Sequence, residues 1–267
     1  MGRRASSRET EALNRAQDLV YDAWEADTAK RRVALAKQAL AISPLCADGY
    51  VLLAEHAKTG SPAELDLWRR GVEAGKAVLG DAFEEYASEF WSFHETRPYM
   101  RARFGLALAL WRRGNRDEAI DNLRDMLRLN PNDNQGVRYV LAARLVEAAR
   151  DDDLSALLKE YPDDGTAAWS WTAALGSFRR HGDSEESRAL LSVAIADNRH
   201  VVRYLLGDRR IPQDVPPYYS SGDEDEAIGY AQDCVAGWVI TPGATDWLRG
   251  QVSAGRPIKR RQARRPQ

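Results

Sequence analysis

The chain has 267 residues, of which 44% are hydrophobic and 29% are charged, and its formal net charge is −2. The hydrophobic share excludes a disordered protein, and the longest apolar run, residues 104–111, is far shorter than the roughly 20 residues that span a bilayer. No apolar segment follows the arginines near the N-terminus, so we expect neither a secretory signal nor membrane anchoring.

The first part of the chain is predicted to form helical hairpins followed by an aromatic insert. Residues 1–8 are expected to be disordered. The predicted helices are, in chain order, Glu9–Asp27, Ala29–Ile42, Tyr50–Ala57 and Pro62–Leu79. Residues 80–96 carry five aromatic side chains without a clear period. We expect this insert to contain a helix and to fill a break between two helical stacks.

Residues 97–133 follow the tetratricopeptide pattern, with Gly114 at the turn between two helices and Pro131 after the second. Small residues let the two helices approach closely, and glycine permits the tight turn. Three landmark pairs lie 68 residues apart, twice the 34-residue period: Gly114 and Gly182, Ala119 and Ser187, Leu123 and Leu191. The sequence therefore predicts an all-α, right-handed α-solenoid of about five tetratricopeptide-like hairpins over residues 9–206.

Residues 207–250 are predicted to form a linker and helices that cap the solenoid. The expected elements are a short helix over His200–Leu206, a proline-rich link over Ile211–Gly222, and helices over Asp223–Val239 and from Pro242 to Arg249. Residues 251–267 form a basic tail that we expect to be disordered. The tail suggests nucleic-acid association as an alternative function, but it has no aromatic residue for base stacking, so we expect no nucleic-acid partner.

Three segments near the C-terminus carry a family resemblance. They are His200–Leu206 leading to Ile211, Gly222–Tyr230, and Trp238 followed by Trp247. In this order, behind helical hairpins, they resemble the suppressor of tumorigenicity 7 protein family over about residues 97–248. The resemblance implies a helical-repeat protein without a defined reaction. Eukaryotic members of the family carry membrane segments in a longer N-terminal region, which has no counterpart in this sequence, so membrane placement is not implied.

The sequence lacks the usual enzyme signatures. It contains no phosphate-binding loop, dinucleotide fingerprint, nucleophile elbow or zinc-protease motif. None of its four histidines has a cysteine or second histidine at ligand spacing, and the two cysteines, Cys46 and Cys234, lie far apart. We therefore expect a non-enzymatic protein without metal or cofactor, in a reducing cytoplasm.

One polar cluster, His94–Arg103, suggests a ligand site. It contains an imidazole, a carboxylate, a phenol and three guanidinium groups, with Pro98 in the first turn of a predicted helix. One interpretation of this pattern is an anion or carboxylate site formed by Arg97, Tyr99 and Arg103. A small-ligand protein or an enzyme centred here is the alternative function. The competing interpretation is a charge network that joins the aromatic insert to the third hairpin.

The first helix of each hairpin is expected to line a concave groove. The repeat phase predicts these groove residues: Arg101, Phe104, Leu108, Trp111, Arg112, Arg138, Trp169, Thr172 and Arg179. Aromatic anchors beside arginines suit a peptide with acidic and apolar groups. The leading prediction is a scaffold or adaptor that binds a protein or peptide segment in this groove. In the alternative arrangement, the C-terminal helices fold back and fill it. The partner's identity and the oligomeric state are not predicted.

Overall fold

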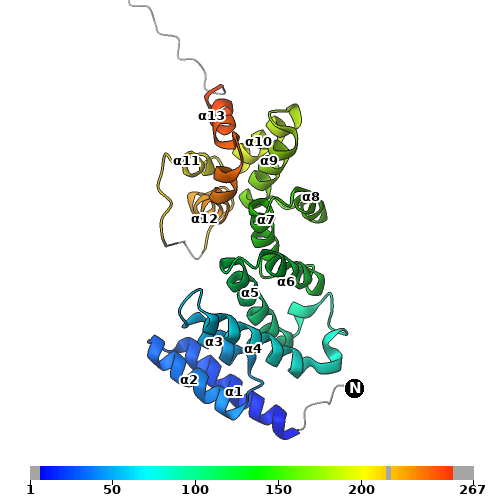
Figure 1. Cartoon of the computed structure of the whole chain (residues 1–267), viewed down its shortest axis with the longest axis vertical. Coiled ribbons are helices and arrows are strands. Elements are labelled where there is room, and N and C mark those ends of the chain that lie inside the picture. Colours follow the sequence, from blue (N-terminus) through cyan, green and yellow to red (C-terminus); the bar gives the residue numbers. More distant parts are fainter. Residues whose placement is uncertain (1–6, 215–217, 255–267) are drawn as a thin grey trace, which may run out of the picture. The chain divides into compact units, whose positions relative to one another are not determined.

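The computed structural model describes residues 7–214 and 218–254. These residues form α-helices and short 3₁₀ helices without β-strands, which confirms the predicted all-α fold class for the described part of the chain. The chain divides into two compact units, Met1–Leu141 (unit 1) and Ala142–Gln267 (unit 2). The division falls inside α7 (Val137–Glu147), within the stretch predicted as one solenoid (Figure 1).

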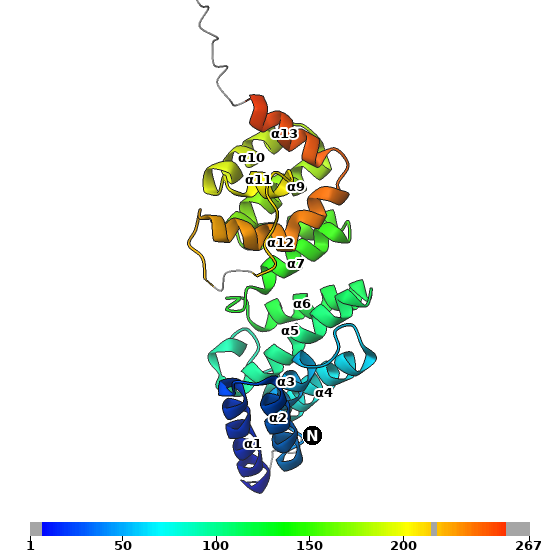
Figure 2. The same cartoon turned by 90° about the vertical axis from the view of Figure 1, so that its left-hand side faces the viewer.

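Unit 1 is a succession of helices in which each of α1 to α5 packs against the next (Figures 1 and 2). Besides the start of α7, its α-helices are α1 (Ser7–Glu25), α2 (Ala29–Ile42), α3 (Ala47–Glu55), α4 (Pro62–Leu79), α5 (Arg97–Arg112) and α6 (Arg116–Leu129). Helices α2 and α4 have the predicted bounds. Each begins at a side-chain cap: Thr28 accepts a hydrogen bond from the Arg31 amide and Ser61 from the Glu64 amide.

The aromatic insert contains three 3₁₀ helices, Gly80–Phe83, Phe90–Ser92 and His94–Thr96, in place of an α-helix. Phe83 and Phe90 are buried with ring centroids 5.0 Å apart, and the Tyr99 ring of α5 lies 5.1 and 5.8 Å from them. The insert therefore packs its aromatic side chains against the beginning of α5.

The two hairpins with matching landmarks both have a left-handed glycine at the turn and a small residue at the contact between their helices. Gly114 and Gly182 adopt φ of +83° and +62°, the left-handed region in which glycine ends a helix without strain. Ala119 is buried between α5 and α6, and its counterpart Ser187 meets Ser177 of the preceding helix, with their hydroxyl oxygens 3.0 Å apart. The handedness of the solenoid and the number of five hairpins stay predictions.

Unit 2 builds its core around α9. Besides the end of α7, its helices are α8 (Asp151–Glu160), α9 (Ala167–His181), α10 (Glu185–Asp197), α11 (Val201–Leu205), α12 (Glu224–Ile240) and α13 (Ala244–Ala254). Helices α12 and α13 pack against α9 (Figures 1 and 2). Trp238 of α12 lies 5.9 Å from Trp171, and Trp247 of α13 stacks on Phe178 at 4.5 Å. Helix α13 begins two residues after Pro242, because Gly243 turns the chain with φ of +78°.

A buried carboxylate connects one of the segments that carry the family resemblance to neighbouring elements of unit 2. Glu226 accepts hydrogen bonds from the Ala167 amide at the start of α9 (3.0 Å), the Asn198 side chain after α10 (2.9 Å) and the Gly222 amide (2.8 Å). A second contact connects α11 to α12, because the Tyr204 hydroxyl donates a hydrogen bond to Glu224 (2.7 Å). These residues therefore hold the C-terminal helices in place.

Candidate functional site

Helix α5 presents one partly exposed stripe of polar and apolar side chains. The stripe is Arg97, Arg101, Phe104, Leu108 and Arg112, and the spacing of three or four residues places them on the same face. With a rise of 1.5 Å per residue, the stripe is about 22 Å long. Along this face of unit 1, two hollows adjoin at Arg101.

The first of them, the α3/α5 hollow, is a cavity of about 310 Å³. Four of the predicted groove residues line it: Arg101, Phe104, Leu108 and Arg112. Trp68 of α4 and Gln135 complete its wall. The repeat phase thus brings together the groove residues that it predicts from this hairpin, except Trp111.

Trp111 lies beside the hollow rather than in its lining. It is partly buried against the hydrophobic core of unit 1, and the Arg116 guanidinium carbon lies 5.3 Å from its ring centroid. This contact covers one face of the ring.

The two arginines of the α3/α5 hollow are already paired with buried carboxylates. Arg101 donates to both oxygens of Asp48 (2.8 and 2.6 Å), and Arg112 donates to Glu64. The two carboxylate side chains are only 0% and 5% exposed. The buried carboxylates therefore balance the positive charge of the two arginines, while each guanidinium keeps further N–H groups for hydrogen bonding. At the rim, burial raises the pKa of Glu55 above its ordinary value.

Two buried polar atoms in the wall of the α3/α5 hollow are unsatisfied. Within residues 7–214 and 218–254, no hydrogen-bond partner lies near Nε1 of Trp68 or Oε1 of Gln135. One is a donor and the other an acceptor. Buried polar side-chain atoms in native proteins nearly always have hydrogen-bond partners, so this pair suggests that a ligand supplies the missing acceptor and donor.

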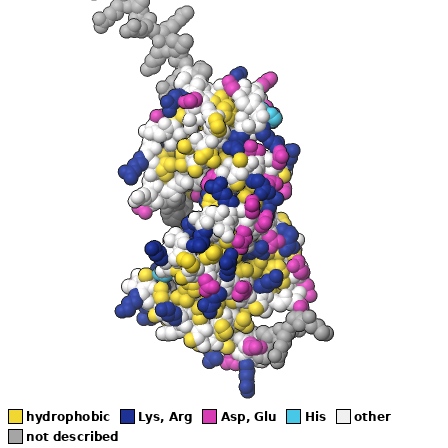
Figure 3. All heavy atoms as spheres, viewed as in Figure 1, with side chains coloured by type: hydrophobic (Ala, Val, Ile, Leu, Met, Phe, Trp, Pro, Cys, Tyr) yellow, Lys and Arg dark blue, Asp and Glu magenta, His cyan; other side chains and the backbone are white. Residues whose placement is uncertain are grey.

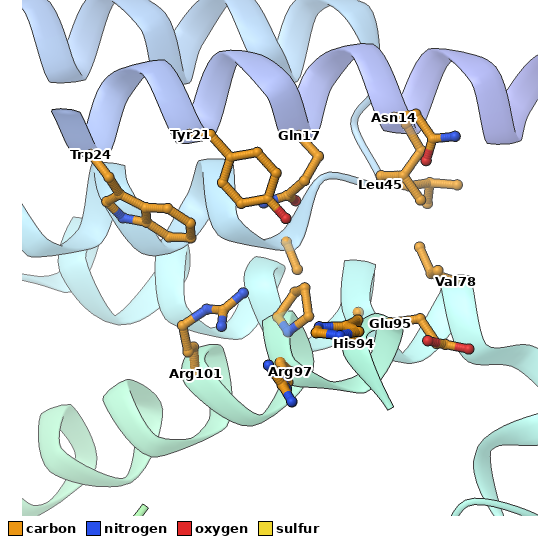
Figure 4. Close-up of a pocket in the computed structure, with 14 residues that line it drawn as sticks. Asn14, Gln17, Tyr21, Trp24, Leu45, Val78, His94, Glu95, Arg97 and Arg101 are labelled. Carbon is orange, nitrogen blue, oxygen red and sulfur yellow. The ribbon is translucent and has the colours of Figure 1, made fainter. Parts of the chain in front are cut away.

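The second hollow, the α1/α5 hollow, has a volume of about 440 Å³ and lies between α1 and the start of α5 (Figure 4). On one side α1 contributes the aromatic side chains of Tyr21 and Trp24. On the other side lie His94, Arg97 and Arg101. The Arg101 guanidinium carbon is 5.3 Å from the Trp24 ring centroid, so Arg101 borders both hollows.

The predicted anion site of Arg97, Tyr99 and Arg103 does not form as a unit. Only Arg97 lines the α1/α5 hollow. Tyr99 is buried against the aromatic insert, and burial raises the pKa of its hydroxyl. Arg103 donates to that hydroxyl and to Asn122 (3.1 Å), and pairs with Asp125 (2.5 Å). Tyr99 and Arg103 thus take part in contacts within the hairpin of α5 and α6.

The remaining predicted groove residues have structural contacts. Arg138 pairs with Asp133 (3.1 Å) in unit 1. In unit 2, Trp169 and Thr172 are only 5% and 2% exposed. Arg179 pairs with Asp151 (2.6 Å) and donates to Thr241 just after α12 (2.8 Å). The C-terminal helices thus cover this face of α9, as in the alternative arrangement that the sequence left open.

Residues of α1 are the part of the site that sequence reasoning missed. Gln17 donates to Asp48 (3.0 Å), and Trp24 faces Arg101, although α1 precedes α5 by a long stretch of chain. The only sequence signal was the placement of Tyr21 and Trp24 three residues apart on a helix, which puts two aromatic rings on one face.

The described residues also bear on the predictions about metal sites and membrane-spanning helices, and they include only the first part of the predicted basic tail. Within the described ranges, no three His, Cys, Asp or Glu side chains are grouped to hold a metal ion. No helix in the same ranges is long and apolar enough to cross a membrane. Of the predicted basic tail, residues 255–267 lie outside the described residues.

This chain is similar to a family of known proteins. The family model described as ST7 protein matches residues 7–252. The Protein ST7 homolog of Caenorhabditis elegans is 29% identical over 274 residues, which cover 86% of this chain and 49% of the relative. The Suppressor of tumorigenicity 7 protein-like of Rattus norvegicus is 26% identical over 268 residues, covering 90% and 47%.

The Suppressor of tumorigenicity 7 protein of Macaca fascicularis is 25% identical over 287 residues, which cover 90% of this chain and 53% of the relative. The chain thus spans about half the length of the curated relatives it matches. The family match, in contrast, covers most of this chain, including the Glu226 network and both hollows. The chain therefore belongs to the ST7 protein family, as its C-terminal segments predicted.

Proposed function

We propose that unit 1 binds an extended segment of another protein along the open face of α5, without a chemical step. One observation carries this proposal. The α3/α5 hollow combines four stripe residues with a donor on Trp68 and an acceptor on Gln135 that have no partner among the described residues. A peptide unit offers one C=O and one N–H, which are the complementary groups.

The stripe also defines what kind of segment fits. Phe104 and Leu108 in its middle suit an apolar side chain, and the guanidinium groups of Arg101 and Arg112 on either side suit carbonyl or carboxylate oxygens. A length of about 22 Å corresponds to about seven extended residues. We therefore propose a segment with an apolar centre flanked by acidic residues.

Long-range electrostatic attraction contributes little to this proposal. On the visible face of unit 1, basic and acidic side chains are interspersed with apolar ones (Figure 3). Because the hollow's arginines are paired with Asp48 and Glu64, recognition depends on short-range hydrogen bonds and apolar contact.

Both cysteine thiols, Cys46 and Cys234, are free, which supports a reducing compartment, and we propose a cytoplasmic location.

The proposal is tested by selecting short random peptides on the purified chain by phage display. Synthetic versions of the selected peptides are then titrated by fluorescence polarisation. Leu108→Asp places a charge in the apolar centre and is expected to weaken binding at least about tenfold. Val193→Asp is the matched control, because Val193 is an exposed apolar residue of α10 in unit 2.

A second variant tests the unsatisfied donor. Trp68→Phe removes Nε1 but keeps an aromatic ring, and we expect about fivefold weaker peptide binding. Because Trp68 belongs to the core of unit 1, the smaller ring also lowers thermal stability, so binding is measured well below the melting temperature of the variant. Selected peptides that bind Leu108→Asp as well as the wild-type chain contradict the proposal. So does a selection that yields no peptide.

A further inference from the structure

The α1/α5 hollow contains a cation whose charge no carboxylate balances. Arg101 in the same hollow is paired with Asp48, and Arg103 on the other side of α5 is paired with Asp125. Arg97 differs, because its one hydrogen bond within the described ranges goes from Nε to the neutral backbone carbonyl of Trp91 (3.1 Å). Its two terminal nitrogens have no hydrogen-bond partner there.

The contacts of Arg97 also fix its orientation. The guanidinium carbon lies 5.3 Å from the ring centroid of Trp91, in addition to the bond from Nε to the Trp91 carbonyl. A long side chain held at two points loses less conformational entropy when it binds a ligand. The terminal N–H groups of Arg97 are thus preorganised donors in a half-buried position.

His94 supplies a second donor group beside Arg97. Both side chains lie on the α5 side of the hollow, opposite Gln17 and Tyr21 of α1 (Figure 4). In the part of the chain that the structure describes, the imidazole of His94 has no hydrogen bond or ion pair, and the same holds for the amide of Asn14 at the α1 side. The hollow therefore offers several donors that face no protein acceptor.

The one acidic residue in the lining does not neutralise these donors. Glu95 accepts a hydrogen bond from the Tyr86 hydroxyl (3.2 Å) and forms no ion pair with a described residue. In Figure 4 its carboxylate lies at the end of the hollow away from Arg101. The cationic part of the hollow, around Arg97 and His94, stays open to an external anion.

We infer that Arg97 and His94 form an anion subsite for an acidic side chain, carboxylate or phosphate, of the segment bound along α5. This inference rests on the proposed function, since the two hollows adjoin at Arg101. The cavity of about 440 Å³ accommodates such a side chain, and Tyr21 and Trp24 form its apolar cover. The subsite is the part of the α5 face that selects for charge, whereas the α3/α5 hollow selects for apolar contact.

The experiment uses the peptides selected on the full chain. For each acidic position, versions with glutamate, phosphoserine and serine are titrated against wild type, Arg97→Ala, His94→Ala and Arg113→Ala. Arg113 is the matched control, because this α5-capping arginine also donates to a backbone carbonyl, that of Gly60 (2.7 Å), and lies outside the hollow. Thermal melting of each variant checks that it folds.

At one position we expect the anionic peptides to bind about tenfold more tightly than the serine peptide. Arg97→Ala should abolish this preference, His94→Ala should reduce it, and Arg113→Ala should leave it intact. A larger preference for phosphoserine than for glutamate assigns phosphate as the favoured group. Inorganic phosphate should compete only with the anionic versions.

Two other results separate the failures. If peptides bind, lose affinity with Leu108→Asp and keep their acidic preference with Arg97→Ala, the subsite is wrong and the proposed function stands. If no peptide binds but inorganic phosphate still protects Arg97 from modification by phenylglyoxal, the anion site stands and the peptide groove is wrong. If no peptide binds and inorganic phosphate does not protect Arg97 from phenylglyoxal, the inference is wrong.

Discussion

Helices α5 and α9 occupy equivalent positions in their hairpins, yet the corresponding face is open on α5 and buried on α9. With a shift of 68 residues, Arg101 corresponds to Trp169 and Phe104 to Thr172. The α5 residues line an open hollow, whereas Trp169 and Thr172 are buried. In unit 2 the covering elements are α12 and α13, which pack against α9. The repeat phase therefore determines which face a helix presents, and a later segment determines whether that face stays open.

The strongest test of this difference compares two tryptophans. Trp238 covers α9, is 0% exposed and donates to the Tyr230 hydroxyl (2.9 Å). Trp238→Ala should lower the free energy of unfolding by about 4 kcal/mol, because it leaves a cavity in the core of unit 2. Trp24 borders the open hollow and is 37% exposed, so Trp24→Ala should cost less than about 1 kcal/mol. Urea unfolding measures both, and equal losses would contradict the comparison.

A smaller effect is expected from two glycines on α12. A Cβ at Gly237 would lie 2.6 Å from Cγ1 of Val146, whereas a Cβ at Gly229 meets no atom within 4 Å. Gly237→Ala should therefore destabilise unit 2 by about 2 kcal/mol through overpacking. Gly229→Ala should stabilise it by up to about 1 kcal/mol, because alanine favours the helix. Thermal unfolding of the two single variants is the measurement, and the same sign for both would show that α12 does not pack closely on α7.

The smallest expected effect is a difference in pH response. Hydrogen bonds from the Glu226 amide to Asp223 and from Tyr204 to Glu224 lower the pKa of both carboxyl groups. Their stabilisation is present above their ordinary pKa values and is lost as pH falls through the lowered ones. Glu55 in unit 1 has the opposite shift, because burial raises its pKa, so acidification favours the folded form there.

Hydrogen exchange between about pH 5 and pH 3, corrected for intrinsic rates, should resolve this difference. Amides of the first turn of α12, beside Asp223 and Glu224, should lose protection relative to amides of α3 as the pH falls. Asp223→Asn should reduce the pH dependence of α12. A gain in α12 protection relative to α3 on acidification would contradict the assigned directions.

Much of unit 1 could be predicted because its signals are local. The predicted bounds of α2 and α4 agree with the structure, and both helices begin beside local helix-start residues, Thr28 for α2 and Ser61 with Pro62 for α4. The 3.6-residue period likewise placed Phe104 and Leu108 on one face with their flanking arginines. Local signals therefore predicted the bounds of α2 and α4 and the shared face of Phe104 and Leu108. Glu55 and Trp68, which also line the α3/α5 hollow, come from other helices and were not predicted.

Arg97 and Tyr99 face different sides of α5 for a reason that helix geometry explains. Arg97 and Tyr99 are two residues apart, so an α-helix turns them about 200° from each other. Tyr99 and Arg103, four residues apart, share the face that packs against the aromatic insert and α6. Arg97 instead shares a face with Arg101, which lines the same hollow.

Other parts of the site depend on contacts between distant segments. Nothing near Gln17 or Trp24 in the sequence indicates that α1 faces Arg101. Similarly, the burial of Thr172 depends on α12, which lies behind a proline-containing link. Such packing is decided by the complementarity of whole helices, which a local pattern does not contain.

Glu226 has a consequence for the order of events during synthesis. Its carboxylate bonds the Ala167 amide, 59 residues earlier in the chain. At typical translation rates, those residues take roughly 3 to 12 s to add. For that interval the start of α9 lacks its acceptor, and the face that α12 later covers is exposed on the nascent chain. The packing of α12 against α9 and the bond between Glu226 and the Ala167 amide therefore form only after this interval.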